Sequence, residues 1–359
     1  MEIVVLQCIP SGLPQGSHLG PLLFILFFND ATKIFKFAKL GVFADDLKLY
    51  AKINSSTDAV YLQEDMDLFS AWCKKNGMEL SIDKCKIMTF HRKSLPIDHD
   101  YRIESTSVER VREIRDLGVT LDEKLNFNSH VAKIVSKAHS MLGFLKRICY
   151  EFRNVRALTS IYNAHVRSHL EYASVLWNPH YAVRSGEIES VQKQFVMFAL
   201  RKSVRRDSNF RLPPYADRCS SLGLETLARR RDNSCIFFVF DVLRKNIDAP
   251  QLLEIFDSLR TVNRTYSFRT MNIFRTVFHR TKYRASEPIN AASKLFNTVS
   301  HLYVDETSRE SFRAKVRALT TIREFTPVSH FHWDDCVLCH EFVLPYDVLH
   351  SLIARHLLL

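Results

Sequence analysis

Two adjacent aspartates, Asp45 and Asp46, are the residues of this chain whose types and spacing best fit chemistry. Neighbouring carboxylates repel each other, and a turn that is chosen for stability more often carries Asn-Gly or Asp-Gly. The pair becomes favourable when Mg²⁺ lies against it, because this ion prefers hard carboxylate oxygens and bridges to substrate phosphates. An exposed acidic turn without a ligand is the alternative, and it is the commoner explanation for a bare Asp-Asp pair.

The residues on either side of the pair predict a β-hairpin with the acids at its tip. A short apolar run, 40–44, leads into the pair. After it, Leu47, Leu49 and Ala51 alternate with Lys48, Tyr50 and Lys52. This alternation is typical of a strand that turns one face to a core.

A second segment upstream could approach a ligand closely. It reads Ser11-Gly12-Leu13-Pro14-Gln15-Gly16-Ser17 and is followed by Leu19-Gly20-Pro21-Leu22-Leu23-Phe24. Gly and Pro at this density favour sharp turns and close backbone approach. The apolar run that continues to Phe28 predicts a buried helix opened by Pro21. An ordinary loop that leads into a core helix is the alternative for this segment.

Together, in this order, the two motifs resemble the reverse transcriptases of non-LTR retrotransposons of the jockey and LINE type. Phe43 and Ala44 match the non-LTR form of the catalytic hairpin. The resemblance implies that Asp45 and Asp46 are catalytic and bind Mg²⁺. It also implies nucleotide or template contacts for Ser11, Gly12, Pro14, Gln15, Gly16, Phe43 and Ala44. The implied partners are an RNA template, a DNA primer and deoxynucleoside triphosphates.

The resemblance continues through 72–86, where Lys84 matches the lysine of the family's next palm motif. This lysine could donate a proton or a hydrogen bond to the leaving pyrophosphate, although a solvated loop lysine is an equal alternative. In the family, a first palm motif with its own metal-binding aspartate precedes the segment matched at Ser11. Only ten residues precede Ser11 here, and Glu2 is the sole acid among them. We therefore expect an incomplete two-metal site and a truncated copy or an incomplete gene model.

Composition narrows the class of protein. The chain has 359 residues, 46% of them hydrophobic and 25% charged, with a net charge of +11 that suits a polyanionic partner. The eight cysteines are mostly scattered, which favours reduced thiols in an intracellular protein, nuclear or cytoplasmic. The apolar run at 3–6 is too short for a secretory signal, and 22–28 is too short for a membrane span. We expect neither secretion nor a membrane partner.

The remaining pattern predicts helices and short strands. A helix should run from Ser55 to Asn76, a strand over 85–90, and a short strand and turn over 116–122. From Val131 an apolar face recurs at helical spacing: Val131, Ile134, Val135, Ala138, Met141, Leu142, Leu145 and Ile148. Lys133, Lys137, Lys146 and Arg147 lie largely off that face. The resemblance implies a thumb that clamps a duplex through its backbone.

We therefore predict an α+β fold, in which a partial polymerase palm with an antiparallel sheet is followed by a mainly α-helical thumb and C-terminal region. The expected limits are 1–122 for the palm, 123–207 for the thumb, 208–320 for the helical C-terminal region and 321–359 for an unassigned tail. In the tail, Cys336, Cys339 and His340 could bind zinc, but a lone Cys-x-x-Cys is usually coincidence.

Two functions remain open at this point. The chain could be an RNA-directed DNA polymerase, or a remnant that binds nucleic acid through a basic thumb and catalyses nothing. The missing aspartate favours the remnant for this chain and the polymerase for its family. Template preference and oligomeric state do not follow from the sequence.

Overall fold

The computed structural model describes residues 18–44, 46–91, 96–203, 213–260, 272–275, 285, 287–306 and 308–319. It divides the chain into two compact units, Met1–Ile114 and Arg115–Leu359. The described elements are mainly helices, accompanied by small two-stranded sheets, so the predicted α+β class is confirmed.

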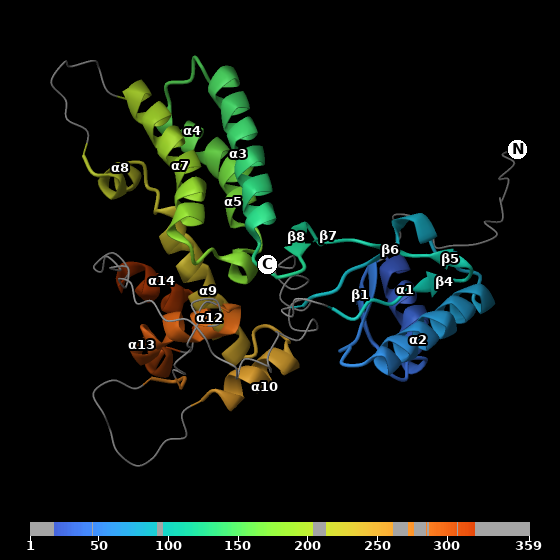
Figure 1. The fold of residues 1–359 in the computed structure, drawn as a ribbon. Helices are drawn as coiled ribbons and strands as arrows, with labels where there is room; N and C mark the ends of the chain where they lie inside the picture. The colour runs from blue at the N-terminus through green and yellow to red at the C-terminus, as the bar shows by residue number, and fades with distance from the viewer. Residues whose placement is uncertain are drawn as a thin grey trace, which may run out of the picture. The chain divides into compact units, whose positions relative to one another are not determined.

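The first unit is built from two helices and a hairpin. The helices are α1 (Gly20–Asn29) and α2 (Ser56–Lys75), and the hairpin joins β1 (Lys39–Phe43) to β2 (Asp46–Tyr50) (Figure 1). A capping box formed by Ser55 and Asp58 starts α2, as the run of hydroxyl residues predicts. Short 3₁₀ helices lie at Asp30–Lys33 (η1) and Ile82–Lys84 (η2).

The other strands of this unit are short. β3 (Lys86–Ile87) pairs in parallel with β6 (Glu109–Arg110), and β4 (Arg102–Ile103) pairs antiparallel with β5 (Thr106–Ser107). The strand expected over 85–90 is therefore reduced to two residues, because β6, its partner, is itself only two residues long. The division between the two units falls within β7 (Glu113–Asp116), which pairs with β8 (Val119–Asp122) of the second unit.

The helix at Pro21 forms where predicted, but it is not buried as a whole. Gly20 and Phe28 are buried, whereas Leu22, Ile25 and Leu26 are exposed. The reason is geometric, since a helix presents side chains all round its axis and α2 and the hairpin pack against one side only.

The second unit is mostly helical. Its longer helices are α3 (Asn128–Ile148), α7 (Ala182–Ser203) and α9 (Leu227–Leu243). Shorter ones are α4 (Val155–Tyr162), α5 (Ser168–Glu171), α6 (Ser174–Trp177), α8 (Tyr215–Ser221), α10 (Pro250–Ser258), α12 (Pro288–Asn297), α13 (Ser300–Asp305) and α14 (Arg309–Leu319).

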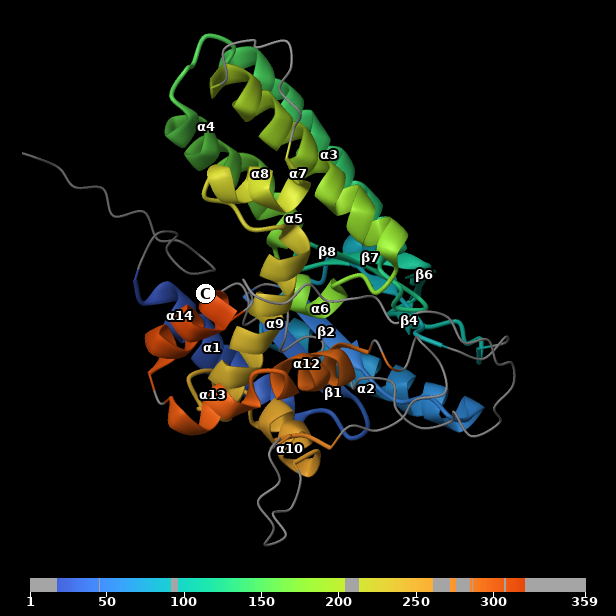
Figure 2. The same ribbon diagram turned by 90° about the vertical axis from the view of Figure 1, so that its left-hand side faces the viewer.

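Figures 1 and 2 show α3 and α7 side by side, and α9 is the central helix of the unit. α9 packs against α6, α7, α10, α12 and α14, so helices assigned above to a thumb and to a C-terminal region share one packed unit. The finer domain limits stay a prediction.

The helical stretch from Val155 to Trp177 is interrupted twice. A π-helical turn, η3 (Asn163–Arg167), separates α4 from α5, and a left-handed Ala173 separates α5 from α6. The second break lets the hydroxyl of Tyr172 donate to the carbonyl of Leu117 at 2.7 Å. Gly118 is required beside it, because its φ is +87° and an added Cβ would lie 3.1 Å from the Tyr172 ring.

Candidate active site

The β1–β2 hairpin brings part of the predicted site together. Its register pairs Phe43 with Asp46 across the strands, so the turn of the hairpin lies between these two residues and includes Ala44. Leu40 and Leu47 face the core of the unit. Because side chains alternate along each strand, Phe43 and Asp46 project from the opposite face. The carboxylate of Asp46 is exposed there.

The hairpin turn is strained at Ala44. Its φ is +52°, in the left-handed region that Gly and Asn adopt readily and that disfavours a residue with a Cβ by about 1–2 kcal/mol. Two-residue hairpin loops of this kind usually carry Asn-Gly or Asp-Gly. The turn therefore gives up some stability, which is common where a loop has a functional role.

An apolar platform supports the hairpin. Phe28, Phe69 and Cys73 form its buried centre together with Ala31, and Leu40 and Leu47 pack against it. Trp72 adds an edge contact, with its ring 5.5 Å from that of Phe28. The hairpin thus rests on α1 and α2, whose aromatic rings fix its position.

A buried carboxylate ties the foot of the hairpin to α2. The Oδ1 atom of Asp65 accepts the backbone N–H of Lys36 at 3.0 Å, and Oδ2 accepts those of Phe37 at 2.8 Å and Ala38 at 2.6 Å. These three residues lead directly into β1. Our sequence analysis missed Asp65, although an acid on the apolar stripe between Leu62 and Phe69 was a usable signal.

The structure describes some of the other predicted site residues and leaves out the rest. Six lie outside the described residues: Ser11, Gly12, Pro14, Gln15, Gly16 and Asp45. Lys84 lies at the end of η2, exposed, with its backbone N–H donating to the carbonyl of Ser81 at 3.0 Å. Only Phe43, Ala44 and Asp46 are therefore seen together, at the hairpin tip.

The chemistry of Asp46 fits a metal ligand. Its exposed carboxylate forms no ion pair or hydrogen bond with any residue that the structure describes, so its hard oxygens are free to bind a cation. Among the described residues, those of the hairpin included, no three His, Cys, Asp or Glu side chains gather in one place as a metal site. Asp30, the acid that follows α1, is paired with Lys33 at 2.9 Å.

The helix predicted from Val131 is confirmed as α3, and its role as part of a thumb stays a prediction. Val131, Ala138, Leu142 and Leu145 are buried as the periodicity predicts, whereas Ile148 is exposed because the last turn of α3 lies at the end of the bundle.

Lys137 and two histidines, His165 and His169, lie where α3 meets η3 and α5. The pKa of His169 is lowered by burial first, and then by the positive charges of Lys137 and His165 nearby. Neither Lys137 nor His165 forms an ion pair within the part of the chain that the structure describes. The positive charge of this surface comes from Lys137, because the lowered pKa of His169 favours its neutral ring.

Two further expectations concern the rest of the molecule. None of the described helices is both long enough and apolar enough to cross a membrane. The tail residues Cys336, Cys339 and His340 lie outside the described residues, so the zinc hypothesis stays untested.

Comparison with known proteins agrees with the hairpin motif. Residues 7–121 match the model of the family described as reverse transcriptase (RNA-dependent DNA polymerase). Among curated proteins, the chain is 29% identical over 145 residues to the probable RNA-directed DNA polymerase from transposon BS of Drosophila melanogaster. It is 30% identical over 136 residues to the RNA-directed DNA polymerase from mobile element jockey of the same species.

These alignments cover small parts of much longer relatives. The match to the BS protein takes in 38% of this chain and 16% of that protein, and the match to the jockey protein takes in 35% and 14%. No solved structure matches the chain. The chain therefore carries a reverse transcriptase domain over residues 7–121, and its homologues are RNA-directed DNA polymerases of jockey, BS and X-element retrotransposons.

Proposed function

We propose that the chain takes part in RNA-directed DNA synthesis, with Asp45 and Asp46 as ligands of Mg²⁺. The observation that carries the proposal is the Phe-Ala-Asp-Asp sequence at a strained hairpin tip inside the family match. Bound Mg²⁺ would supply the positive charge that stabilises a transferred phosphoryl group. The intracellular location expected for such work is part of the proposal, and the described cysteines, which are all free, support it.

The residues of the chain itself would have distinct roles. Asp46 would hold the cation from the end of β2, and Asp45 from the turn. Gln15 and Gly16, with Phe43 and Ala44, would line the nucleotide and the RNA template. Lys84 would donate a hydrogen bond to the leaving pyrophosphate.

The proposal includes an incomplete ligand set. Two-metal transfer uses carboxylates from separate strands, and residues 1–44 contain only Glu2 and Asp30 as acids. Because Asp30 is paired with Lys33, we expect slow synthesis at best from this chain without an added carboxylate-bearing segment.

Primer extension on an RNA template tests the proposal. The chain should incorporate deoxynucleotides in Mg²⁺, and Asp46→Asn should abolish incorporation. Asp67→Asn, an exposed acid on α2, should leave it unchanged. Equal incorporation by the chain and Asp46→Asn would remove Asp46 from the mechanism.

The second candidate is a non-catalytic nucleic-acid-binding protein. The net charge of +11 favours it, and Lys137 on α3, which lies exposed near His169, is one cation that would contact phosphate. This candidate predicts salt-sensitive binding to RNA or to a duplex, with no incorporation by any variant. Binding that is equally tight at low and high salt would contradict it.

A further inference from the structure

The end of the helical bundle farthest from the N-terminus of α3 exposes four large apolar side chains. They come from the last turns of α3 and from the connection 149–154 that follows. The exposed fractions are 49% for Phe144, 59% for Ile148, 72% for Tyr150 and 45% for Phe152. We call this surface, with the basic residues described next, the bundle tip. It lies outside the family match at 7–121.

Basic side chains surround these apolar groups. α3 supplies Lys146 and Arg147, the connection supplies Arg153, and α7 supplies Arg201 and Lys202. None of the five forms an ion pair with a residue that the structure describes. The pKa of Lys146 is lowered, chiefly by burial and then by the charge of Arg201. Positive charge is therefore crowded at the tip, where five cations face one acid of the connection, Glu151, which forms no ion pair with any of them.

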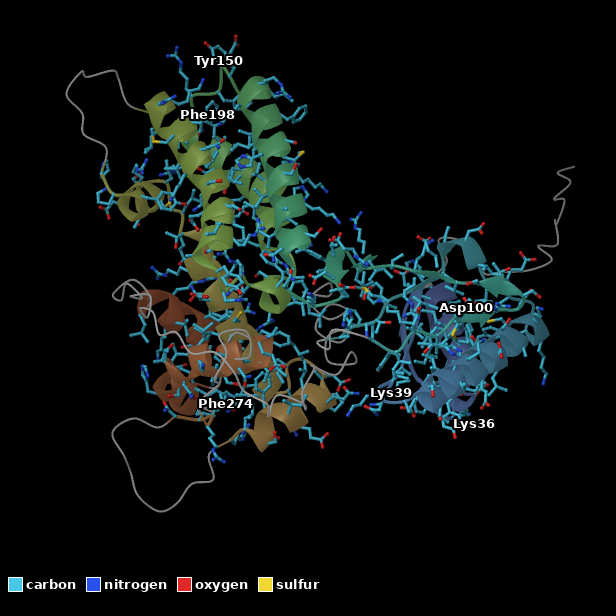
Figure 3. The ribbon with its side chains drawn as sticks, viewed as in Figure 1. Lys36, Lys39, Asp100, Tyr150, Phe198 and Phe274 are labelled. Atoms are coloured by element: carbon cyan, nitrogen blue, oxygen red, sulfur yellow. The ribbon has the colours of Figure 1, made fainter. Side chains whose placement is uncertain are left out.

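One of these cations holds an aromatic ring in place. The Nζ atom of Lys202 lies 4.6 Å from the centre of the Tyr150 ring and 5.6 Å from that of Phe198, and it also donates to the carbonyl of Tyr150 (Figure 3). This contact occupies one side of the Tyr150 ring and fixes its plane. With 72% of the residue exposed, the remaining ring surface is open to a flat partner.

Helix stability explains only part of this arrangement. Cations are ordinary in the last turn of a helix, where they complement the helix dipole, and α3 and α7 both end here. That effect does not explain why large apolar side chains are exposed between the cations. Pairing of two tips from copies of this chain is disfavoured, because it would bring like charges together.

Exposed aromatic rings among unpaired cations match one ligand chemistry especially well. In single-stranded nucleic acid the bases offer flat surfaces for stacking, and the phosphates offer negative charge at regular spacing. In a duplex the base faces are already stacked on each other. Only the phosphates could then contact the tip, and its aromatic rings would have no base to stack on.

We propose that the bundle tip binds single-stranded nucleic acid, with bases stacked on Tyr150 and Phe152 and phosphates beside the surrounding cations. The inference does not depend on polymerase chemistry, since it needs neither aspartate of the hairpin. The bundle tip lies outside residues 7–121, so the family match assigns no ligand to this surface.

Fluorescence anisotropy with the full chain and labelled oligonucleotides tests the proposal. Two single strands of equal length are compared, one of uridines and one with abasic positions throughout. The uridine strand should bind more tightly. Tyr150→Ala and Phe152→Ala should each weaken its binding by about tenfold, the effect of losing one stacked base, and should leave abasic binding nearly unchanged.

Charge variants separate stacking from phosphate contacts. Arg147→Ala and Arg201→Ala should weaken both strands alike and should lower the dependence of affinity on salt. Tyr150→Phe should bind as the unchanged chain does, since the ring remains. Tyr181→Ala and Lys294→Ala are matched controls, because both side chains are exposed in the same unit but lie outside the tip. Circular dichroism verifies that each variant is folded.

Three outcomes would overturn the proposal. Equal affinity for uridine and abasic strands would show that no base stacks. Unchanged binding by a folded double variant, Tyr150→Ala with Phe152→Ala, would place the binding elsewhere. Binding of the tip to vesicles with anionic lipid, together with no measurable binding to either strand, would identify a membrane surface instead. None of these results bears on primer extension, so the two proposals can fail separately.

Discussion

Replacing Asp65 by Asn should loosen the β1–β2 hairpin without changing the shape of the side chain. In the native chain, one carboxylate oxygen accepts from Lys36 and the other from Phe37 and Ala38. An Asn that keeps its oxygen toward Phe37 and Ala38 retains two weaker hydrogen bonds. Its amide NH₂ then faces the N–H of Lys36, donor against donor, and that bond is lost.

The magnitude follows from the type of bond. A hydrogen bond to a charged group contributes about 1.5–3 kcal/mol, against about 0.5–1.5 kcal/mol for a neutral pair. One lost charged bond and two weakened ones give a loss of roughly 2–4 kcal/mol, which is less than the plain sum because the N–H groups of Lys36 and Phe37 are only partly buried and water can replace part of each bond. For Asp65→Ala we expect about 3–5 kcal/mol, because the N–H of Ala38 is then buried without a partner and only the other two are partly open to water.

Hydrogen exchange followed by mass spectrometry measures this effect locally. Amides over 36–50 should exchange between about 30-fold and nearly a thousandfold faster in Asp65→Asn, since each 1.4 kcal/mol is a factor of ten. Amides in α3, which belongs to the other unit, should be unaffected. Asp67→Asn is the matched control, because within the described part of the chain that exposed carboxylate accepts a hydrogen bond only from the Gln63 side chain, at 2.9 Å.

Two results would refute this reasoning. Native exchange rates over 36–50 in Asp65→Asn would show that the three bonds do not hold the hairpin. An equal rise in both units would show that Asp65 acts on the whole chain rather than on the foot of β1.

Three further predictions concern single residues. Burial, followed by nearby cations, lowers the pKa of His130 to about 4 from its ordinary 6.5, so folding favours the neutral ring. The stability that depends on this neutral ring is therefore complete above about pH 6.5 and is lost as the pH falls toward 4, by at most about 1.4 kcal/mol per pH unit. Thermal melting at a series of pH values should show this slope, and the slope should be smaller in His130→Gln. Ala44→Gly should stabilise the hairpin by up to about 1 kcal/mol, because Gly tolerates positive φ, and exchange over 39–50 should slow; faster exchange would contradict the strain. Glu189→Gln should lower the free energy of unfolding in urea by about 2–3 kcal/mol. The reason is that the carboxylate accepts the N–H groups of Leu227 at 3.0 Å and Ala228 at 3.1 Å at the start of α9, and an unchanged urea midpoint would contradict it.

The sequence by itself determined the elements whose signals are local. Alternating apolar residues fixed the hairpin around the twin aspartates, and the run of hydroxyl residues fixed the start of α2. The apolar periodicity from Val131 fixed α3. The order of two motifs also identified the reverse transcriptase domain, because a family resemblance depends on residue types and spacing alone.

Only the tertiary structure decided which of those residues have partners. Asp65 lies 27 to 29 residues along the chain from the amides it binds, and no local pattern encodes that distance. Ile148 continues the apolar face of α3 yet is exposed, since periodicity shows which side of a helix could be covered, not whether another element reaches it. The cation beside Tyr150 comes from α7, so the tip exists only because two helices distant in sequence end together.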